Sequence, residues 1–122
     1  MKVDGIYFLI VSGKTGYRSN PNKVFWANSL AGPWTGGTDI APADAKTYGS
    51  QNTFELTIKG TKKNTHIYMG DAWDSKGSAA SNYVWLPMSV NARYVTKKLH
   101  CGCKLLTLPC VVQLKDCHPT EL

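Results

Sequence analysis

The sequence predicts an all-β fold of antiparallel strands joined by hairpins. Short runs rich in β-branched and aromatic residues recur along the first 95 residues, and clusters of Gly, Pro, Asn and Ser separate them. Helical spacing is not convincing anywhere, and the stretch "APADAK" at residues 41–46 is expected to form one turn at most. The recurrence of strand and turn signals therefore favours sheets throughout this part of the chain.

Five runs are predicted to be strands, and their grouping suggests an architecture. Residues 5–46 would hold about two strands and a long connection, whereas residues 50–95 would hold three or four strands. Four-stranded units that repeat roughly every 40 to 50 residues are typical of β-propeller blades. Two such units cannot close a propeller, so the chain would be a partial propeller or an open sandwich with exposed edges. The five runs are residues 5–12, 23–29, 53–60, 65–71 and 82–89.

Composition fits one small globular domain and argues against two classes of partner. The 122 residues are 43% hydrophobic and 18% charged. The net charge is +6, but the Lys and Arg residues are scattered, and the closest group (Lys59, Lys62 and Lys63) is expected at a solvated hairpin tip. No nucleic-acid partner is therefore predicted. No apolar run approaches the roughly 18 residues of a membrane span, so no membrane partner is predicted either.

The two ends of the chain differ in composition from the strand-rich part between them. The start has Asp4 before a short β-rich apolar stretch, so no signal peptide is evident. After about residue 95 the sequence becomes rich in Leu, Cys and Lys and shows no clear alternation of apolar and polar residues. Residues 96–122 are therefore expected to form an atypical Cys-containing tail, with the boundary near residues 94–98. This tail holds all four cysteines, which is unlike a disulfide framework for the whole domain. They are Cys101, Cys103, Cys110 and Cys117.

A zinc site formed by these cysteines with His118 is the metal-binding alternative for the tail. The spacing lacks the paired C-x2-C knuckles that structural zinc sites usually have. We therefore predict no metal and no cofactor. Foreign coding sequence, such as read-through past an exon boundary, is a further hypothesis for this segment.

Five motifs follow one another along residues 1–95. They are "KVDGIYFLIVSGKTGYRSNPNKVFWANSLAGPWT" (2–35), "DIAP" (39–42), "SQNTF" (50–54), "IYMGDAWD" (67–74) and "YVWLP" (83–87). In this order they resemble the C-terminal part of glycoside hydrolase family 43, and most closely the branch that contains galactan 1,3-β-galactosidases. The resemblance implies a five-bladed β-propeller with a sugar in its axial pocket, of which residues 1–95 would be about the last two blades.

The resemblance implies hydrolysis of β-1,3-linked galactose with inversion, which needs a general acid and a second group that activates water. In the family the acid is a Glu in an E-(A/S)-P stretch just before the strand corresponding to residues 5–12. This sequence has no Glu before Glu55 and no E-x-P stretch. The chain would then carry only the water side of the site, and the parent enzyme is expected to be secreted.

Gln51, in "SQNTF", is the candidate catalytic residue. The resemblance implies that it orients the attacking water, and that it could act as a base only through an unusual amide tautomer. A side-chain amide offers one acceptor oxygen and two donor hydrogens, so it could hold a water and a sugar hydroxyl together. Without the resemblance, the favoured interpretation is that Gln51 hydrogen-bonds the backbone of a neighbouring turn.

The candidate substrate-binding residues are Thr15, Gly16, Tyr17 and Trp73. In "KTGYRSNPN", the Thr15 hydroxyl would contact the sugar, and Tyr17 would offer an aromatic face to it. Packing between blades is the favoured alternative for Trp73. The expected ligand is a β-1,3-galactan or arabinogalactan oligosaccharide.

Other residues of these motifs are given structural roles. Asn20 and Asn22 are expected to shape their turn, Asp71 and Asp74 to cap turns, and Trp34 to be a core anchor. Ala72 stands where the family has an Arg, which leaves the electrostatics of the pocket open.

Two rival functions remain beside the glycosidase interpretation. The chain could be a catalytically inactive carbohydrate-binding remnant, or a propeller remnant with no function of its own because its sheet edges are unpaired. The sequence does not predict an oligomeric state.

Overall fold

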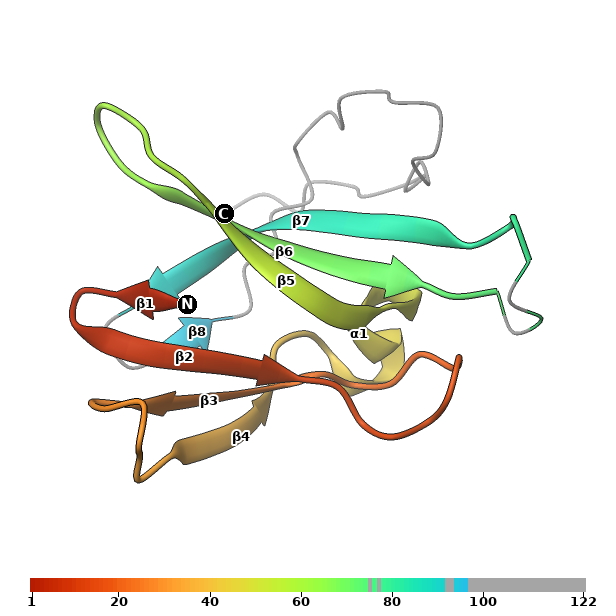
Figure 1. Cartoon of the computed structure of the whole chain (residues 1–122), viewed down its shortest axis with the longest axis horizontal. Coiled ribbons are helices and arrows are strands. Elements are labelled where there is room, and N and C mark those ends of the chain that lie inside the picture. Colours follow the sequence, from red (N-terminus) through yellow and green to blue (C-terminus); the bar gives the residue numbers. More distant parts are fainter. Residues whose placement is uncertain (75, 77, 92–93, 97–122) are drawn as a thin grey trace, which may run out of the picture.

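The fold consists of two four-stranded antiparallel sheets (Figure 1). The structure, a computed structural model, describes residues 1–74, 76, 78–91 and 94–96. The sheets follow chain order, so each strand pairs with its neighbours in sequence. This confirms the predicted all-β class. The first sheet contains β1 (Lys2–Val3), β2 (Ile6–Val11), β3 (Lys23–Ala27) and β4 (Thr35–Asp39), and the second contains β5 (Gln51–Ile58), β6 (Thr65–Ala72), β7 (Asn82–Asn91) and β8 (Tyr94–Thr96).

The five predicted strands are found as β2, β3, β5, β6 and β7, but the prediction for residues 5–46 is wrong. That part of the chain holds β4 as well, and β1 precedes β2 to complete the sheet. β4 has the sequence TGGTD, in which two glycines weaken the strand signal. It forms by pairing with β3 through a register shift, and at Gly36 a Cβ would lie 2.8 Å from the Val24 carbonyl oxygen.

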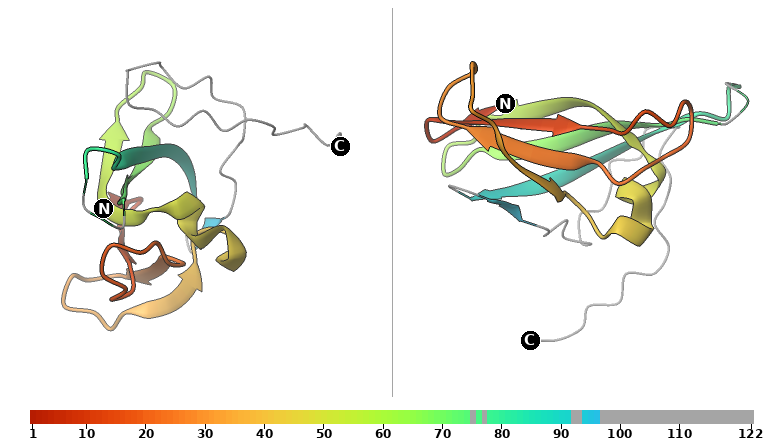
Figure 2. Two further views of the ribbon diagram at one scale, coloured as in Figure 1. Left: turned by 90° about the vertical axis from the view of Figure 1, so that its right-hand side faces the viewer. Right: turned by 90° about the horizontal axis from the view of Figure 1, so that it is seen from below.

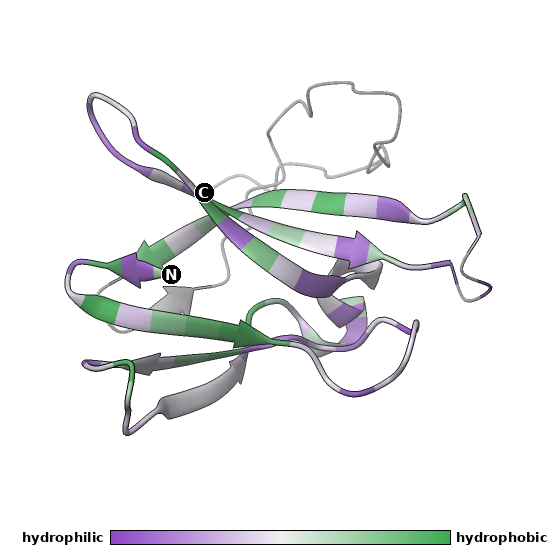
Figure 3. Cartoon of the chain, viewed as in Figure 1, coloured by the Kyte–Doolittle hydropathy of each residue, from purple (hydrophilic) through white to green (hydrophobic). Residues whose placement is uncertain are grey.

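The core lies between the two sheets, which stack as layers (Figure 2). Alternate residues of β2 point inward, so Phe8 and Ile10 are buried while Leu9 is 43% exposed. Tyr68 of β6 joins them from the second sheet, at 1% exposure. The hydropathy colouring shows the apolar character of β2 (Figure 3). The buried cluster consists of Phe8, Ile10, Val24, Ile40 and Tyr68.

A short left-handed turn connects the sheets. It follows the 3-10 turn η1 (Ala43–Ala45) and comprises the segment α1 (Lys46–Gly49). Lys46, Thr47 and Tyr48 have φ angles of 45°, 52° and 55°, which non-glycine residues rarely adopt. α1 is therefore not a regular α-helix. Within residues 41–46 the structure has the single 3-10 turn η1, in agreement with the expectation of one turn at most for that stretch. Among the described residues no helix is long and apolar enough to span a membrane.

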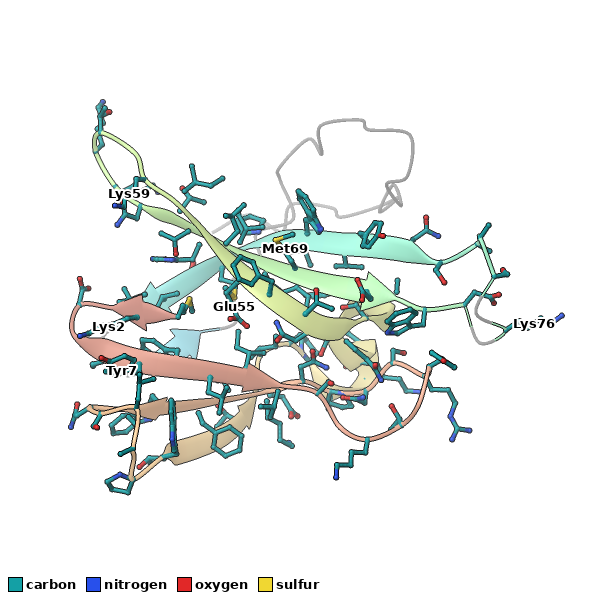
Figure 4. All side chains as sticks on the ribbon, viewed as in Figure 1. Lys2, Tyr7, Glu55, Lys59, Met69 and Lys76 are labelled. Atoms are coloured by element: carbon teal, nitrogen blue, oxygen red, sulfur yellow. The ribbon has the colours of Figure 1, made fainter. Side chains whose placement is uncertain are left out.

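The second sheet has an apolar outer face as well as a buried inner one. Phe54, Met69 and Trp85 are opposite one another on β5, β6 and β7. Phe54 is 58% exposed and Trp85 is 46% exposed. Met69 lies between them in the strand order and is labelled in Figure 4. Tyr83, also 58% exposed, extends this row along β7.

Candidate functional site

The Gln51 side chain lies where the two sheets meet. It is the first residue of β5, and its Nε2 donates to backbone carbonyls of the loop that follows β2. The distances are 2.9 Å to the oxygen of Gly16 and 2.8 Å to the oxygen of Arg18, and a third contact of 3.1 Å reaches Thr15 Oγ1. Because a carbonyl oxygen can only accept, the NH₂ end of the amide must face this loop.

This orientation has a direct chemical consequence for Gln51. Its Oε1 accepts no hydrogen bond from any described residue, so it is available as an acceptor for a ligand. An ionised carboxylate in the same place would face two carbonyl oxygens and lose both hydrogen bonds. The amide therefore suits this position better than an acid. The bond to a neighbouring loop, which the residues alone favoured, is present, and it fixes the orientation of the group.

Asn20 holds the loop in shape. Its Nδ2 donates to the Gly13 oxygen (3.1 Å) and to Thr15 Oγ1 (2.9 Å), and its Oδ1 accepts from the Gly13 N–H (2.8 Å). The Thr15 hydroxyl donates to the Arg18 oxygen. Since Thr15 Oγ1 also accepts from Gln51, its hydrogen-bonding capacity is used within the protein. A contact between Thr15 and a sugar would require one of these bonds to be exchanged, and it stays a prediction.

Asn22 connects this loop to the second sheet and is fully buried. Its Oδ1 accepts from the Asn52 N–H (2.7 Å) and from the Tyr68 hydroxyl (3.0 Å). Its Nδ2 donates to the oxygen and the Oδ1 of Asn20, at 3.0 and 3.2 Å. Its N–H donates to Thr47 Oγ1 at 2.7 Å. The prediction that Asn20 and Asn22 shape the turn is thus confirmed, although Asn22 also extends beyond it.

Tyr68 and Ser50 complete the buried polar contacts beneath Gln51. The Ser50 hydroxyl lies 2.6 Å from the Thr47 oxygen and 2.9 Å from the Tyr68 hydroxyl. Because Tyr68 donates its hydrogen to Asn22 Oδ1, the single hydrogen of Ser50 is shared between the Thr47 oxygen and the Tyr68 hydroxyl oxygen. Burial raises the pKa of Tyr68 to about 12, the Ser50 bond opposes this, and nearby Glu55 and Asp71 add to it. Tyr68 therefore keeps its proton, and its role as a donor, at neutral pH.

An exposed aromatic pair borders the loop between β2 and β3 (residues 12–22), which holds the Gln51 side chain and is here called the Gln51 loop. Tyr17, in that loop, and Trp73, just after β6, have ring centroids 5.6 Å apart with planes tilted by 59°. They are 59% and 42% exposed, so each ring offers a face to solvent. Trp73 follows β6 of the second sheet and contacts Tyr17, which follows β2 of the first sheet, so it packs between the two sheets as the alternative interpretation expects. It nevertheless lies outside the core cluster. Gly16, between Thr15 and Tyr17, adopts a φ of +60° that favours glycine.

Glu55 is a carboxylate near the site that no sequence motif singles out. It is opposite Tyr68 in the β5–β6 register and lies centrally in Figure 4. Its Oε1 accepts from Asn52 Nδ2 at 2.9 Å, and its Oε2 is 4.0 Å from the Met1 amino group. The sequence predicts a strand at residues 53–60 that contains Glu55. Which residue of the neighbouring strand is opposite Glu55 depends on the register between β5 and β6, and the sequence alone does not specify that register.

The remaining predictions have mixed outcomes. Asp74 caps its turn as expected, since its Oδ2 accepts from the Ser78 hydroxyl at 2.6 Å. Trp34 is only half-buried and is not part of the core cluster, so the prediction of a core anchor is wrong; it follows the cis peptide bond Gly32–Pro33 and precedes β4.

Within the described part of the chain, no group of three or more His, Cys, Asp and Glu side chains could hold a metal ion. The cysteines and His118 lie outside the described residues.

The chain is similar to parts of solved exo-β-1,3-galactanases and β-1,3-galactosidases. An exo-β-1,3-galactanase from Phanerochaete chrysosporium, solved with β-1,3-galactotriose, is 45% identical with a TM-score of 0.66 over 73% of the chain. An exo-β-1,3-galactanase from Clostridium thermocellum is 34% identical with a TM-score of 0.67 over 74% of the chain. A family 43 β-1,3-galactosidase solved with galactodeoxynojirimycin is 32% identical with a TM-score of 0.66 over 75%.

The chain resembles part of glycoside hydrolase family 43, in the branch that acts on β-1,3-galactan. It spans only 20%, 20% and 27% of the lengths of these three proteins. No protein-family model matches the sequence, and no curated protein matches it.

Proposed function

We propose that the chain is a piece of a family 43 glycosidase whose parent hydrolyses β-1,3-linked galactose in galactan or arabinogalactan, with inversion. In this proposal residues 1–95 form about the last two blades of a five-bladed propeller, and residues 96–122 are an atypical tail outside the family domain. The parent enzyme is secreted. Two four-stranded sheets in chain order and similarity to β-1,3-galactanases support the proposal.

The observation that carries the proposal is the orientation of the Gln51 amide. Its NH₂ is hydrogen-bonded to the loop carbonyls of Gly16 and Arg18, so its Oε1 can accept a hydrogen bond from water. A water held by one lone pair on Oε1 keeps its own lone pairs for attack on the anomeric carbon. Because a neutral amide is a very weak base, Gln51 would only orient this water. The proton that the water loses on attack must pass to another group or to solvent, and the departing oxygen must be protonated by an acid from elsewhere.

The aromatic pair supports binding of the sugar itself. Galactose presents C–H groups on one face of its ring, and such faces pack against aromatic side chains. Tyr17 is joined to the Gln51 loop through Gly16, so the pair and the amide belong to the same corner of the molecule. We propose Thr15, Gly16, Tyr17 and Trp73 as the residues that surround the bound sugar.

The first experiment separates hydrolysis from binding. We expect the purified 122-residue chain to release no galactose from β-1,3-galactan, because the sequence has no E-x-P stretch to supply the acid. We expect it to bind β-1,3-galactotriose saturably in an NMR titration, with shifts at Gln51, Tyr17 and Trp73. Galactose release at a rate near that of a full-length galactanase would contradict the first expectation.

A matched pair of variants assigns the binding to Gln51. Gln51→Ala removes the Oε1 acceptor and should weaken galactotriose binding by about three- to tenfold, the usual effect of one hydrogen bond. Asn64→Ala removes an exposed amide at the β5–β6 turn and should leave the affinity unchanged. Equal affinities for the two variants would remove Gln51 from the site.

The second candidate function is a carbohydrate-binding remnant without catalysis. The exposed pair of Tyr17 and Trp73 favours it, since stacking on aromatic rings needs no acid–base groups. This function is supported if galactotriose still binds to Gln51→Ala but no longer to Trp73→Ala. If the wild-type chain shows no saturable binding, the chain is a remnant without either function.

A further inference from the structure

We propose that Asn22 is a positioning residue for Gln51. It acts through a closed ring of hydrogen bonds that sets the direction of the Gln51 amide without touching a ligand. The proposal rests on the function proposed above for what that amide does. The ring itself is defined by the contacts within the protein, and it comprises Thr15, Asn20, Asn22, Gln51 and Asn52, here called the polar ring.

The polar ring begins and ends at Gln51. From the backbone, the next residue, Asn52, donates its N–H to Asn22 Oδ1 at 2.7 Å. Asn22 Nδ2 then donates to Asn20, and Asn20 Nδ2 donates to Thr15 Oγ1 at 2.9 Å. Thr15 Oγ1 finally accepts from Gln51 Nε2 at 3.1 Å. Both ends of the Gln51 residue, main chain and side chain, are therefore fixed relative to each other through the same four partners.

Asn22 is the member that anchors the polar ring to the core. It has no solvent exposure, whereas Thr15 and Gln51 are half-buried at the surface. Its backbone oxygen accepts from the Ile40 N–H at 3.0 Å, and its Oδ1 also accepts from the Tyr68 hydroxyl. Asn22 thus joins the Gln51 loop to the β4 connection and to β6. A change at Asn22 is transmitted to Gln51 because Asn52, its direct partner, is the next residue along β5.

Side-chain chemistry explains why an asparagine suits this place. The carbonyl oxygen of Asn22 must accept from two donors, and its NH₂ must donate toward two oxygen atoms of Asn20. Serine can supply one donor hydrogen and a shorter reach, and aspartate supplies no donor at all. Neither can complete the polar ring and the contacts to Asn20 together.

The test measures solvent exchange of the Gln51 side-chain NH₂ hydrogens by NMR, in the full 122-residue chain. In Asn22→Ser we expect this exchange to accelerate by about three- to tenfold, which corresponds to the loss of one hydrogen bond. Backbone amide exchange in β6 and β7 reports general loosening and should change less than the Gln51 side chain. Unchanged exchange of the Gln51 hydrogens would overturn the proposal.

Tyr68→Phe is the matched control. It removes a buried hydroxyl that also contacts Asn22 Oδ1, but it leaves every bond of the polar ring in place. We expect Gln51 exchange in Tyr68→Phe to stay near the wild-type rate. Equal acceleration in Asn22→Ser and Tyr68→Phe would mean that any disturbance of the core releases Gln51, and the proposal would fail. If Asn22→Ser does not fold, Asn20→Asp cuts the polar ring at its bond to Thr15 and gives the same readout.

A titration with β-1,3-galactotriose links positioning to binding. Asn22→Ser should weaken binding by a factor similar to Gln51→Ala, and the double variant should be no weaker than either single one, because both act on the same acceptor. Additive losses would show that Asn22 acts independently of Gln51 and would contradict the proposal. If the wild-type chain does not bind galactotriose, the proposed function fails, while the exchange measurements still decide whether Asn22 positions Gln51.

Discussion

The two faces of the β5–β7 sheet differ in a way that reverses the usual pattern. The inner face combines the aromatic ring of Tyr68 with buried polar groups, all of which are hydrogen-bonded within the described residues. The outer face carries the large apolar side chains Phe54, Tyr83 and Trp85, which are 46% to 58% exposed. A contiguous apolar surface on a sheet face marks a place where another surface can pack. The outer face of the second sheet therefore has the composition of a contact surface.

Stability and the candidate site both depend on the inner face of this sheet, whereas the outer face governs association. The inner face holds the sheets together and supports Gln51 through Asn22 and Asn52. Among the described residues, the side chains of Phe54, Tyr83 and Trp85 make no such hydrogen bonds, and the exposed apolar area of the outer face is unfavourable in water. Changes to the inner face should alter folding and the site together, whereas changes to the outer face should alter association.

The largest expected effect is a difference in the free energy of unfolding between variants of two tyrosines on opposite faces of the sheet. Tyr68→Ala should destabilise the chain by about 3 to 5 kcal/mol, because it leaves a cavity and removes a partner of Asn22 and Ser50. Tyr83→Ala, on the outer face, should change the free energy of unfolding by less than about 0.5 kcal/mol. Urea unfolding measures both, and similar losses for the two variants would show that the faces do not differ as described.

An alkaline pH profile should sharpen the role of the inner face. The pKa of Tyr68 is raised to about 12 from its ordinary value of 10.0. Between these two pKa values the unfolded chain loses the Tyr68 proton while the folded chain keeps it. The contribution of Tyr68 to the free energy of unfolding is therefore complete below pH 10 and is lost as the pH rises toward 12. At about 1.4 kcal/mol per unit, the loss is roughly 3 kcal/mol.

The control for this profile is Tyr68→Phe, since other tyrosines and the lysines also titrate in this range. The difference in unfolding free energy between wild type and Tyr68→Phe should shrink between pH 10 and 12 by the amount given above. A constant difference across that range would show that Tyr68 ionises equally in both states.

The smallest expected effect on stability comes from the outer face. Replacing Phe54 and Trp85 by Thr should leave the unfolding free energy within about 1 kcal/mol of wild type, and Thr retains a good β propensity. The same double variant should reduce concentration-dependent self-association in sedimentation experiments. Leu30→Thr is the control, because Leu30 is 69% exposed in the turn after β3 and away from this face. Equal reduction in the control would mean that association does not depend on the β5–β7 sheet.

The strands whose residues favour sheets by themselves can be located from the sequence. β4 cannot, because TGGTD has little strand propensity and pairing with β3 decides its conformation. The motif around Gln51 indicates the site residue but not the orientation of its amide, since the carbonyls of Gly16 and Arg18 are more than 30 positions away. The left-handed turn at Lys46–Gly49 was equally hidden, because three of its four residues are not glycine.

The orientation of the Gln51 amide also limits the groups that this corner can recognise. With both NH₂ hydrogens directed at the loop, the side chain presents only lone pairs outward. A hydroxyl or a water can approach it, because either can offer a hydrogen. A methyl ether or a ring oxygen would bring lone pair against lone pair. The Gln51 amide therefore selects ligands that can donate a hydrogen bond to its Oε1. A sugar methylated at the contacting hydroxyl should be excluded even where its shape still fits.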